Sequence, residues 1–160
     1  MEVVNAVYRG ELEEMVNLSQ VHKNLPNSIL HTNKIPMIVL KDNEATIMLF
    51  SSGKFRIMGS MVDELEATCK VYGVFSKLGL EVSFVTLQTM TVKLKLGPIN
   101  LYLLSNLIQS RLDLEIFPSL MVTKYKPVSV NVFATGSVMI CGVKSLDLVN
   151  EIENDLKLLL

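Results

Sequence analysis

The side chains best suited to metal binding or covalent chemistry in this sequence are two cysteines and two histidines. Cys69 lies in a stretch with helical periodicity and Cys141 in a β-strand pattern, and neither has a histidine or second cysteine at metal-site spacing. We therefore expect two buried free thiols rather than a disulfide or a metal centre. His22 and His31 lie in a polar stretch typical of a loop, and no nucleophile or acid pairs with either in the sequence. Because no catalytic or cofactor-binding constellation is present, we expect neither an enzyme nor a cofactor.

The length and composition of the chain favour one ordinary folded domain. Its 160 residues are 49% hydrophobic and 19% charged, and no segment combines low complexity with high net charge. The longest apolar runs are far shorter than the roughly 20 residues that a membrane span needs. The first residues begin with an acid and lack the basic flank and cleavage site of a signal peptide. We therefore expect an intracellular protein with a single domain over residues 1–160.

A duplicated segment organises the chain. The stretch LFSSGKFRIMG at residues 49–59 has a near-copy, VFATGSVMICG, at residues 132–142. One offset of 83 positions (133 − 50) superposes three pairs of residues, namely Phe50 and Phe133, Gly53 and Gly136, and Gly59 and Gly142. We infer two repeats, residues 1–79 and residues 80–160, that share one core.

Each repeat has the pattern of a strand, a helix, a three-stranded meander and a second helix. In the first repeat we expect strand 2–9, helix 11–22, strands 35–41, 45–50 and 54–58, and a helix from about residue 62 to Gly79. In the second repeat we expect strand 81–96, helix 98–109, strands 118–124, 128–133 and 137–142, and a helix from Ser145. Gly79 and Ser145 have the residue types of a helix C-cap and an N-cap.

These elements predict an α+β fold. It consists of one antiparallel sheet of about ten strands with helices on one face only. The buried face of the first long helix is expected to contain Val62, Leu65, Cys69, Tyr72, Phe75 and Leu78, which recur at helical spacing. Because the meander strands are apolar on both sides, the uncovered face of the sheet is itself apolar, and such a surface indicates a binding function.

Three segments of the sequence resemble the TATA-box-binding protein family. LFSSGK resembles the hallmark of that family's first repeat, EIFPSLMVTKYKP resembles its second-repeat ELFPGL…KP segment, and LQTM followed by GPINL is similar to the opening of its second repeat. The resemblance covers nearly the whole chain from about residue 5. It implies a pseudo-symmetric saddle, with one curved antiparallel sheet and helices on the convex face only. It also implies a transcription initiation factor that lays its concave sheet on a widened minor groove, inserts apolar wedges between base steps and bends promoter DNA.

The resemblance assigns DNA-binding roles to individual positions. The wedge positions are Phe50, Phe117, Phe133 and Ile35, the last of which replaces a phenylalanine of the family. The groove-floor positions are Asn5, Val7, Thr89, Thr91, Arg56, Met58, Met139 and Cys141. Met58 and Cys141 stand where the family has threonines, so we expect a weaker preference for TATA sequences. Lys54 and Lys144 match lysines that hold phosphates, whereas Ser137 and Met61 occupy their partner positions.

A plainer interpretation of the same residues stays open. Phe50 and Phe133 also suit a core or a hairpin, as most strand aromatics do. Met58, Met61 and Met139 equally suit core packing. The many departures from the family pattern, together with the lack of an extra amino-terminal region, fit a large DNA virus or a divergent eukaryote.

Charge is unevenly distributed although the net charge is −1. Acidic residues fall mainly in the expected helices and basic residues mainly in the strands and turns, which directs nucleic acid toward the sheet. By the resemblance, Asp113, Glu115 and Pro118 are expected to bind another transcription factor or an RNA polymerase subunit. The expected partners are therefore double-stranded promoter DNA and the transcription machinery, without a membrane or a small-molecule substrate, in the nucleus or a viral transcription compartment. The alternative is a protein-interaction module that keeps this fold, has lost DNA binding and has its concave face covered by a protein.

Overall fold

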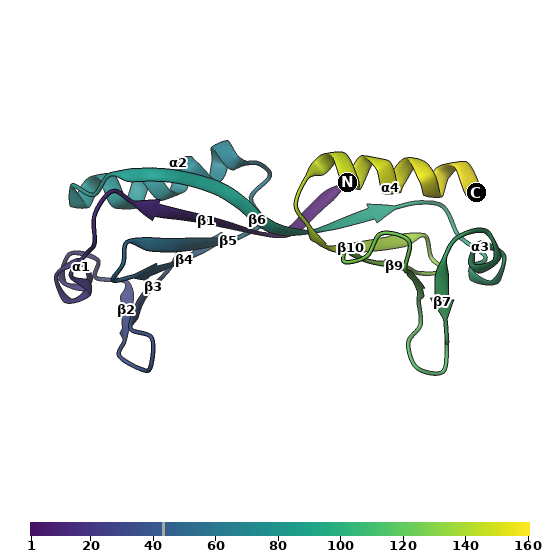
Figure 1. The fold of residues 1–160 in the computed structure, drawn as a ribbon, viewed down its shortest axis with the longest axis horizontal. Helices are drawn as coiled ribbons and strands as arrows, with labels where there is room; N and C mark the ends of the chain where they lie inside the picture. Colours follow the sequence, from purple (N-terminus) through teal and green to yellow (C-terminus); the bar gives the residue numbers. More distant parts are fainter. Residues whose placement is uncertain (43) are drawn as a thin grey trace. The chain divides into compact units, whose positions relative to one another are not determined.

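The computed structural model describes residues 1–42 and 44–160, and its strands form one antiparallel sheet (Figure 1). The ten strands follow the order β2-β3-β4-β5-β1-β6-β10-β9-β8-β7, and the described residues include four α-helices. The chain forms two compact units: an N-terminal unit, Asn5–Gln88, and a C-terminal unit, which combines Met1–Val4 with Thr89–Leu160. The predicted fold class is confirmed. No helix in the described part of the chain is long and apolar enough to cross a membrane.

The N-terminal unit contains most of the first five strands, two α-helices and the first half of β6. Its elements are β1 (Glu2–Leu12), α1 (Leu18–Asn24), β2 (Ser28–His31), β3 (Met37–Lys41), β4 (Ala45–Phe50), β5 (Lys54–Gly59), α2 (Glu64–Phe75) and the 3-10 turn η1 (Ser76–Leu78). The Asp63 carboxylate caps α2 by accepting the N–H of Glu66 at 2.8 Å. Gly79, with φ of 71°, ends the helical segment as predicted.

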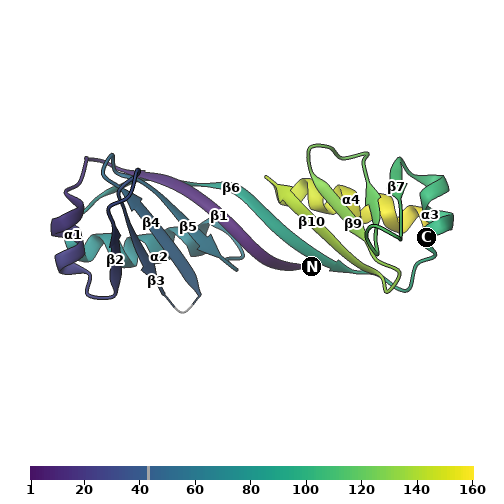
Figure 2. The same ribbon diagram turned by 90° about the horizontal axis from the view of Figure 1, so that it is seen from below.

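The C-terminal unit repeats this order of elements. They are β6 (Val82–Lys95), α3 (Leu101–Leu107), β7 (Ser110–Leu112), β8 (Leu120–Val122), β9 (Ser129–Val132), β10 (Ser137–Val143) and α4 (Leu146–Leu159). The Ser145 hydroxyl caps α4 by accepting the N–H of Leu148 at 3.4 Å, as its residue type predicts. In Figure 2, α2 lies behind the strands of its unit and α4 behind those of the other.

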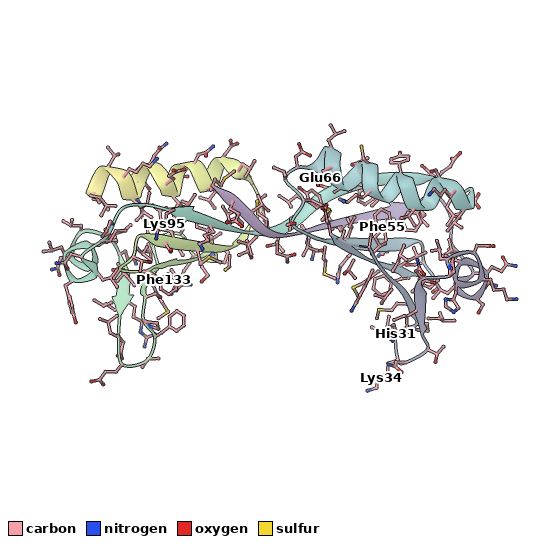
Figure 3. The ribbon with its side chains drawn as sticks, turned by 180° about the vertical axis from the view of Figure 1, so that it is seen from behind. His31, Lys34, Phe55, Glu66, Lys95 and Phe133 are labelled. Carbon is pink, nitrogen blue, oxygen red and sulfur yellow. The ribbon has the colours of Figure 1, made fainter. Side chains whose placement is uncertain are left out.

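The strands of both units alternate between a buried face and an open face. In β4 the buried residues are Ala45, Ile47 and Leu49, and the half-buried residues between them are Thr46, Met48 and Phe50. Buried side chains lie on the side of the long helix: the ring of Phe55 packs on that of Phe75 in α2, with 5.3 Å between centroids (Figure 3). We call the opposite side, away from α2 or α4, the open face of each unit. No described helix covers it.

Two helices begin later than predicted. β1 continues to Leu12, whose N–H donates to the carbonyl of Gly53 at 2.8 Å, so residues 11–17 are not helical. α1 begins at Leu18 because the Asn17 side chain accepts the N–H of Gln20 at 3.2 Å. In the C-terminal unit α3 begins at Leu101 rather than at residue 98, because Asn100 caps it.

Neither histidine lies in a loop. His22 belongs to α1, in agreement with the predicted helix 11–22, and His31 belongs to the short edge strand β2, which the sequence pattern did not indicate. The His22 Nδ1 lies 2.8 Å from the Ser28 hydroxyl, which joins α1 to the first residue of β2. The described residues include no cluster of three metal-ligating side chains.

The buried face of α2 also differs from the prediction. The helix buries Ala67, Val71 and Phe75, each at most 1% exposed. Of the predicted residues, Val62, Leu65 and Tyr72 are 62%, 71% and 46% exposed. Cys69 is exposed and Cys141 half-buried, so the prediction of two buried thiols is wrong, although both cysteines are free. The small side chain of Ala67, placed between helix and sheet, favours this tighter face.

Two glycine turns explain part of the duplicated motif. Gly53 and Gly136 have φ of 92° and 93°, in the left-handed region that favours glycine. A Cβ atom at Gly136 would lie 2.0 Å from the carbonyl oxygen of Leu96, and one at Gly53 would lie 2.6 Å from that of Glu14. Both repeats therefore require a residue without a side chain at the turn between the last two meander strands.

A buried tyrosine ties α4 to the loop before β9. Tyr125 is 8% exposed, and its hydroxyl donates to Asp155 Oδ2 at 2.5 Å. The Lys124 ammonium donates to the same oxygen at 3.1 Å. Burial and the Asp155 carboxylate raise the pKa of Tyr125, whereas the hydrogen bonds from Tyr125 and Lys124 lower the pKa of Asp155.

We expect Asp155→Asn to lower the melting temperature at neutral pH and to have less effect in acid. The pKa of Asp155 is lower in the folded chain, so its ionised form stabilises the fold above the unfolded pKa of about 3.9. That contribution is lost as the pH falls through the folded pKa. Thermal melts between about pH 7 and pH 2.5 test this, with Glu151→Gln on the same helix as the control. A difference from the unmodified protein that stays constant over this range contradicts the assignment.

Candidate nucleic-acid interface

Strand register places one row of side chains across the open face of the N-terminal unit. Arg9 of β1 pairs with Arg56 of β5, which also pairs with Met48 of β4. Met48 in turn pairs with Val39 of β3, and Val39 with Ile29 of β2. The row therefore changes from cationic at β1 to apolar at the edge strand.

A second row on the same face contains predicted groove-floor residues. Val7 of β1 pairs with Met58 of β5, and Met58 pairs with Thr46 of β4. Val7 and Met58 are half-buried, and Asn5 is exposed two residues before Val7 on the same face. Met61, which suited either the core or the open face, is 1% exposed and belongs to the core.

The outer end of this unit carries the two predicted wedges of the first repeat. Phe50 is the last residue of β4, is half-buried and pairs with Met37 of β3. Ile35 is 63% exposed and lies in the segment before β3 rather than in the predicted strand 35–41. Lys34 and His31 lie at the same end of the unit (Figure 3).

The open face of the C-terminal unit has a matching row. Lys93 of β6 pairs with Met139 of β10, which pairs with Asn131 of β9. Asn131 pairs with Met121 of β8, and Met121 with Arg111 of β7. The Asn131 amide accepts the Ser119 hydroxyl and donates to the Ser129 hydroxyl, both at 3.3 Å, so a polar group is fixed in the middle of this row.

The other predicted floor residues of this unit lie beside that row. Thr91 of β6 pairs with Cys141 of β10, and Cys141 pairs with Ser129 of β9. Thr89, Thr91 and Cys141 are half-buried. Cys141 therefore lies between two hydroxyl residues, Thr91 and Ser129, on the neighbouring strands. By the resemblance, Cys141 occupies a position where the family has a threonine.

The two predicted wedges of the second repeat form an aromatic pair. The ring centroids of Phe117 and Phe133 lie 6.1 Å apart, and the ring planes meet at 64° in an edge-to-face arrangement. Phe117 is 44% exposed, and its N–H donates to the carbonyl of Asp113 at 3.0 Å. Figure 3 places Phe133 on the side of its strand away from α4. Phe117 is therefore not a core residue, and Phe133 is half-buried on the open face.

The predicted phosphate and partner residues are all on the surface. Lys54 is exposed and pairs with Glu11 across β5 and β1, and Lys144 is exposed just before the α4 cap. Asp113, Glu115 and Pro118 are exposed in the loop between β7 and β8. The Asp113 carboxylate accepts the N–H of Glu115 at 3.2 Å, and the carbonyl of the same residue accepts two further N–H groups, so this loop is a compact turn.

The helical side of the N-terminal unit is acidic, in contrast to its open face. Tyr8 lies in the core at 2% exposure. Burial raises the pKa of Tyr8, and the negative charges of Asp63, Glu64 and Glu66 at the start of α2 raise it further. Lys54, Arg56 and Arg9 lie on the opposite side of the same strands. The predicted separation of charge therefore holds within this unit.

Sequence reasoning missed three polar residues of the open faces: Arg9, Arg111 and Asn131. The signal that could have found two of them is the two-residue period of a strand. Arg9 lies two residues beyond Val7, and Asn131 lies two residues before Phe133. Arg9 therefore shares a strand face with Val7, and Asn131 with Phe133, and the resemblance gives both Val7 and Phe133 DNA-binding roles.

Comparison with known proteins gives a consistent result. The family model described as "Transcription factor TFIID (or TATA-binding protein, TBP)" matches residues 1–77. The TATA-box-binding protein of Pyrococcus abyssi is 34% identical over 84 residues, which are 50% of this chain and 44% of that protein, so this match spans less than half of the relative. The TATA-box-binding protein of Methanococcus maripaludis is 28% identical over 156 residues, which cover 92% of this chain and 86% of that protein.

The fold comparison extends over both units. The structure of Methanococcus jannaschii TBP matches with a TM-score of 0.80 at 24% sequence identity, covering 99% of this chain and 97% of that one. At this identity the match establishes the fold alone. Taken with the family model over residues 1–77 and the match over 92% of the chain, it shows that this chain has the fold of the TATA-box-binding proteins and is similar to them in sequence along most of its length.

Proposed function

We propose that this protein is a transcription initiation factor that binds promoter DNA in the minor groove through its open faces. It bends the DNA and presents its other surfaces to the transcription machinery. The relatives carry the name TATA-box-binding protein. The open faces support the same activity for this chain, because apolar and half-buried side chains form most of each row and no described helix covers them.

The Phe117–Phe133 pair, with Phe117 exposed and Phe133 half-buried, is the observation that carries the proposal. Aromatic side chains are costly to leave in water, and an aromatic pair that solvent reaches is typical of a binding surface. Proteins that enter the minor groove insert such side chains between base steps and kink the duplex. With 6.1 Å between ring centroids and Phe117 44% exposed, the pair is available to act as such a wedge. Phe50 and Ile35 supply a weaker counterpart in the other unit, since an aliphatic side chain has less surface to stack on a base.

The groove-floor residues favour relaxed sequence recognition. The minor groove distinguishes A·T from G·C pairs mainly through N3 and O2 acceptors and the guanine amino group. Asn5, Thr89, Thr91 and Asn131 can donate to such acceptors, whereas Met58 and Cys141 cannot do so well. We therefore propose a preference for A·T-rich sites that is less strict than a TATA consensus.

Phosphate contacts and partner binding complete the proposed activity. Exposed Lys54 and Lys144 are placed to hold phosphates, but the net charge of −1 gives little general attraction to DNA. A partner is therefore expected to strengthen binding. The compact turn with Asp113, Glu115 and Pro118 is the proposed docking site, because it presents Ile116 at 76% exposure beside two carboxylates. This activity belongs where the template is transcribed, in a nucleus or a viral transcription compartment.

A second candidate function is a protein-interaction module whose open faces are covered by a protein. Met48, Met58, Met121 and Met139 favour it, since all four are half-buried residues of the open-face rows. Methionine-rich surfaces adapt to protein partners of varied shape. The loss of hydroxyls at Met58 and Cys141 and the low net charge agree with this alternative.

Titration against duplexes of equal length separates the two functions. We expect A·T-rich DNA to bind at least about 10-fold more tightly than G·C-rich DNA, because each unfavourable base pair costs about 1–3 kcal/mol. Energy transfer between dyes at the duplex ends reports bending, and each titration is repeated at several salt concentrations. Equal affinities without bending, both alone and with purified RNA polymerase, contradict the proposal and favour the interaction module.

A further inference from the structure

The open face of the N-terminal unit contains a cationic pocket in which Arg9 joins Lys54 and Arg56, the two cations that the resemblance had assigned to phosphate and to the groove floor. Its volume is about 270 Å³. The lining charges are Arg9, Lys54 and Arg56 against Glu11, a net charge of +2 (3 − 1). Phe50 and Phe84 also line it, and Phe84 is 40% exposed. A local excess of positive charge is notable in a chain whose net charge is −1.

Two arginines face each other in this pocket without a partner to balance them. Arg9 and Arg56 are directly opposite in the register of β1 and β5. Like charges at directly opposite positions of a sheet are destabilising. Neither arginine, nor Lys54, belongs to an ion pair among the described residues. A sheet that keeps such a pair has a local cost in the free protein, which a bound anion removes.

The equivalent place in the C-terminal unit is built differently. Lys93 stands in the position of Arg9, and Met139 in that of Arg56. Lys95 is already engaged, because its ammonium donates to the carbonyl of Thr135 at 3.0 Å and to the Ser137 hydroxyl at 3.4 Å. The paired guanidinium groups are therefore a feature of one unit only.

We propose that Arg9, Arg56 and Lys54 form a phosphate-binding pocket that holds one backbone phosphate of the DNA in the N-terminal unit. This inference rests on the proposed function and specifies a contact within it. Guanidinium groups bind phosphate oxygens through two parallel hydrogen bonds, and Lys54 adds a point charge. Because the paired arginines belong to the N-terminal unit and have Lys93 and Met139 as their counterparts in the other, this unit gains an anchor of its own.

Nucleic acid fits the pocket better than an acidic protein segment does. A carboxylate side chain would pair with the cations but would not pack on the aromatic side chains of the lining. In a nucleotide the phosphate is joined to a sugar and a base, which pack on aromatic side chains. Phe50 and Phe84 lie in the lining with the three cations, so both parts of a nucleotide find a matching surface.

The first test is the salt dependence of DNA binding. Each neutralised phosphate contributes about 0.9 to the slope of log K against log salt concentration. We expect the double variant Arg9→Met and Arg56→Met to lower this slope by about 1. Lys77→Met in η1, an exposed residue outside the open face, is the matched control for loss of positive charge and is expected to keep the slope. Arg9→Lys with Arg56→Lys keeps the charge but not the planar fork, so it is expected to keep the slope and bind more weakly.

A scan of single methylphosphonate substitutions locates the contact. One position is expected to weaken binding of the unmodified protein and to have no effect on the double methionine variant. An unchanged slope in that variant, or equal sensitivity of both proteins at every position, overturns the pocket while the proposed function stands.

A second experiment tests the pocket if the protein binds no DNA. That result contradicts the proposed function, and the pocket is then tested with inorganic pyrophosphate and polyglutamate at constant ionic strength. A rise in the melting temperature of the unmodified protein with pyrophosphate, absent from the double methionine variant, supports a phosphate site. No rise overturns it, and an equal rise with polyglutamate shows a carboxylate site instead.

Discussion

Replacing Phe117 and Phe133 together with alanine is expected to abolish most of the DNA bending by this protein. Stacking of a base on an aromatic side chain contributes about 1–3 kcal/mol, so the loss of two such contacts lowers the affinity for A·T-rich DNA by at least about 30-fold. The bend decreases because no apolar wedge then holds the base step open. Energy transfer across a labelled duplex and a binding titration measure the two effects separately.

The same variant is expected to remain folded, because Phe117 is 44% exposed and Phe133 lies on the open face. Phe55→Ala is the matched comparison. Its ring is 1% exposed and packs on Phe75, so that change is expected to cost about 3–5 kcal/mol of unfolding free energy. A loss of stability in the double variant as large as that of Phe55→Ala contradicts the assignment of the pair as wedges.

Gly136→Ala is expected to cause the largest loss of stability among glycine-to-alanine changes in the repeated motif. The residue has φ of 93°, and a new Cβ atom would lie 2.0 Å from the carbonyl oxygen of Leu96 and 2.5 Å from that of Gly97. Left-handed strain and forced backbone movement each cost about 1–3 kcal/mol, so we expect a loss of about 3 kcal/mol or more. Denaturant unfolding of the purified variant measures it.

Gly142→Ala separates the two causes. Gly142 also has a positive φ, of 83°, but a Cβ atom there meets no atom within 4 Å. Only the strain of the left-handed backbone is added, and we expect a loss of about 1 kcal/mol. If both variants unfold at the same denaturant concentration, the close contact with Leu96 is not what requires glycine at position 136.

The repeated strands were predictable because their signals are local. Apolar runs, turn residues and the glycines at 53 and 136 belong to segments of a few residues each, and β4 was predicted with its bounds as 45–50. The caps at Gly79 and Ser145 are equally local. The short strands β2 and β7 were not assigned, since four and three residues give too little periodicity.

The buried face of α2 was not predictable from periodicity. Periodicity favours the larger side chains, including Leu65 and Tyr72, for the core. The structure buries Phe75 as predicted, but together with Ala67 and Val71. The distance between helix and sheet decides between these sets of side chains, and that distance depends on residues far away in the sequence.

The candidate site was partly predictable for a similar reason. Resemblance to a family finds positions that match its motifs, and it led to Phe117, Phe133 and Lys54. It assigned Arg56 but not Arg9 opposite it, because that pairing depends on the register of β1 and β5. Strand alternation supplies the missing step once one residue of a face is known.

The division of β1 between the two units has a consequence for folding during synthesis. Met1–Val4 group with Thr89–Leu160, although they are made 85 residues (89 − 4) before Thr89. At a ribosomal rate of about 5–20 residues per second, Thr89 is made roughly 4–17 s after these four residues, and Leu160 roughly 8–31 s after them. Asn5–Gln88 can become ordered in that interval. Met1–Val4 can therefore take their final place only after the residues of the C-terminal unit have been made.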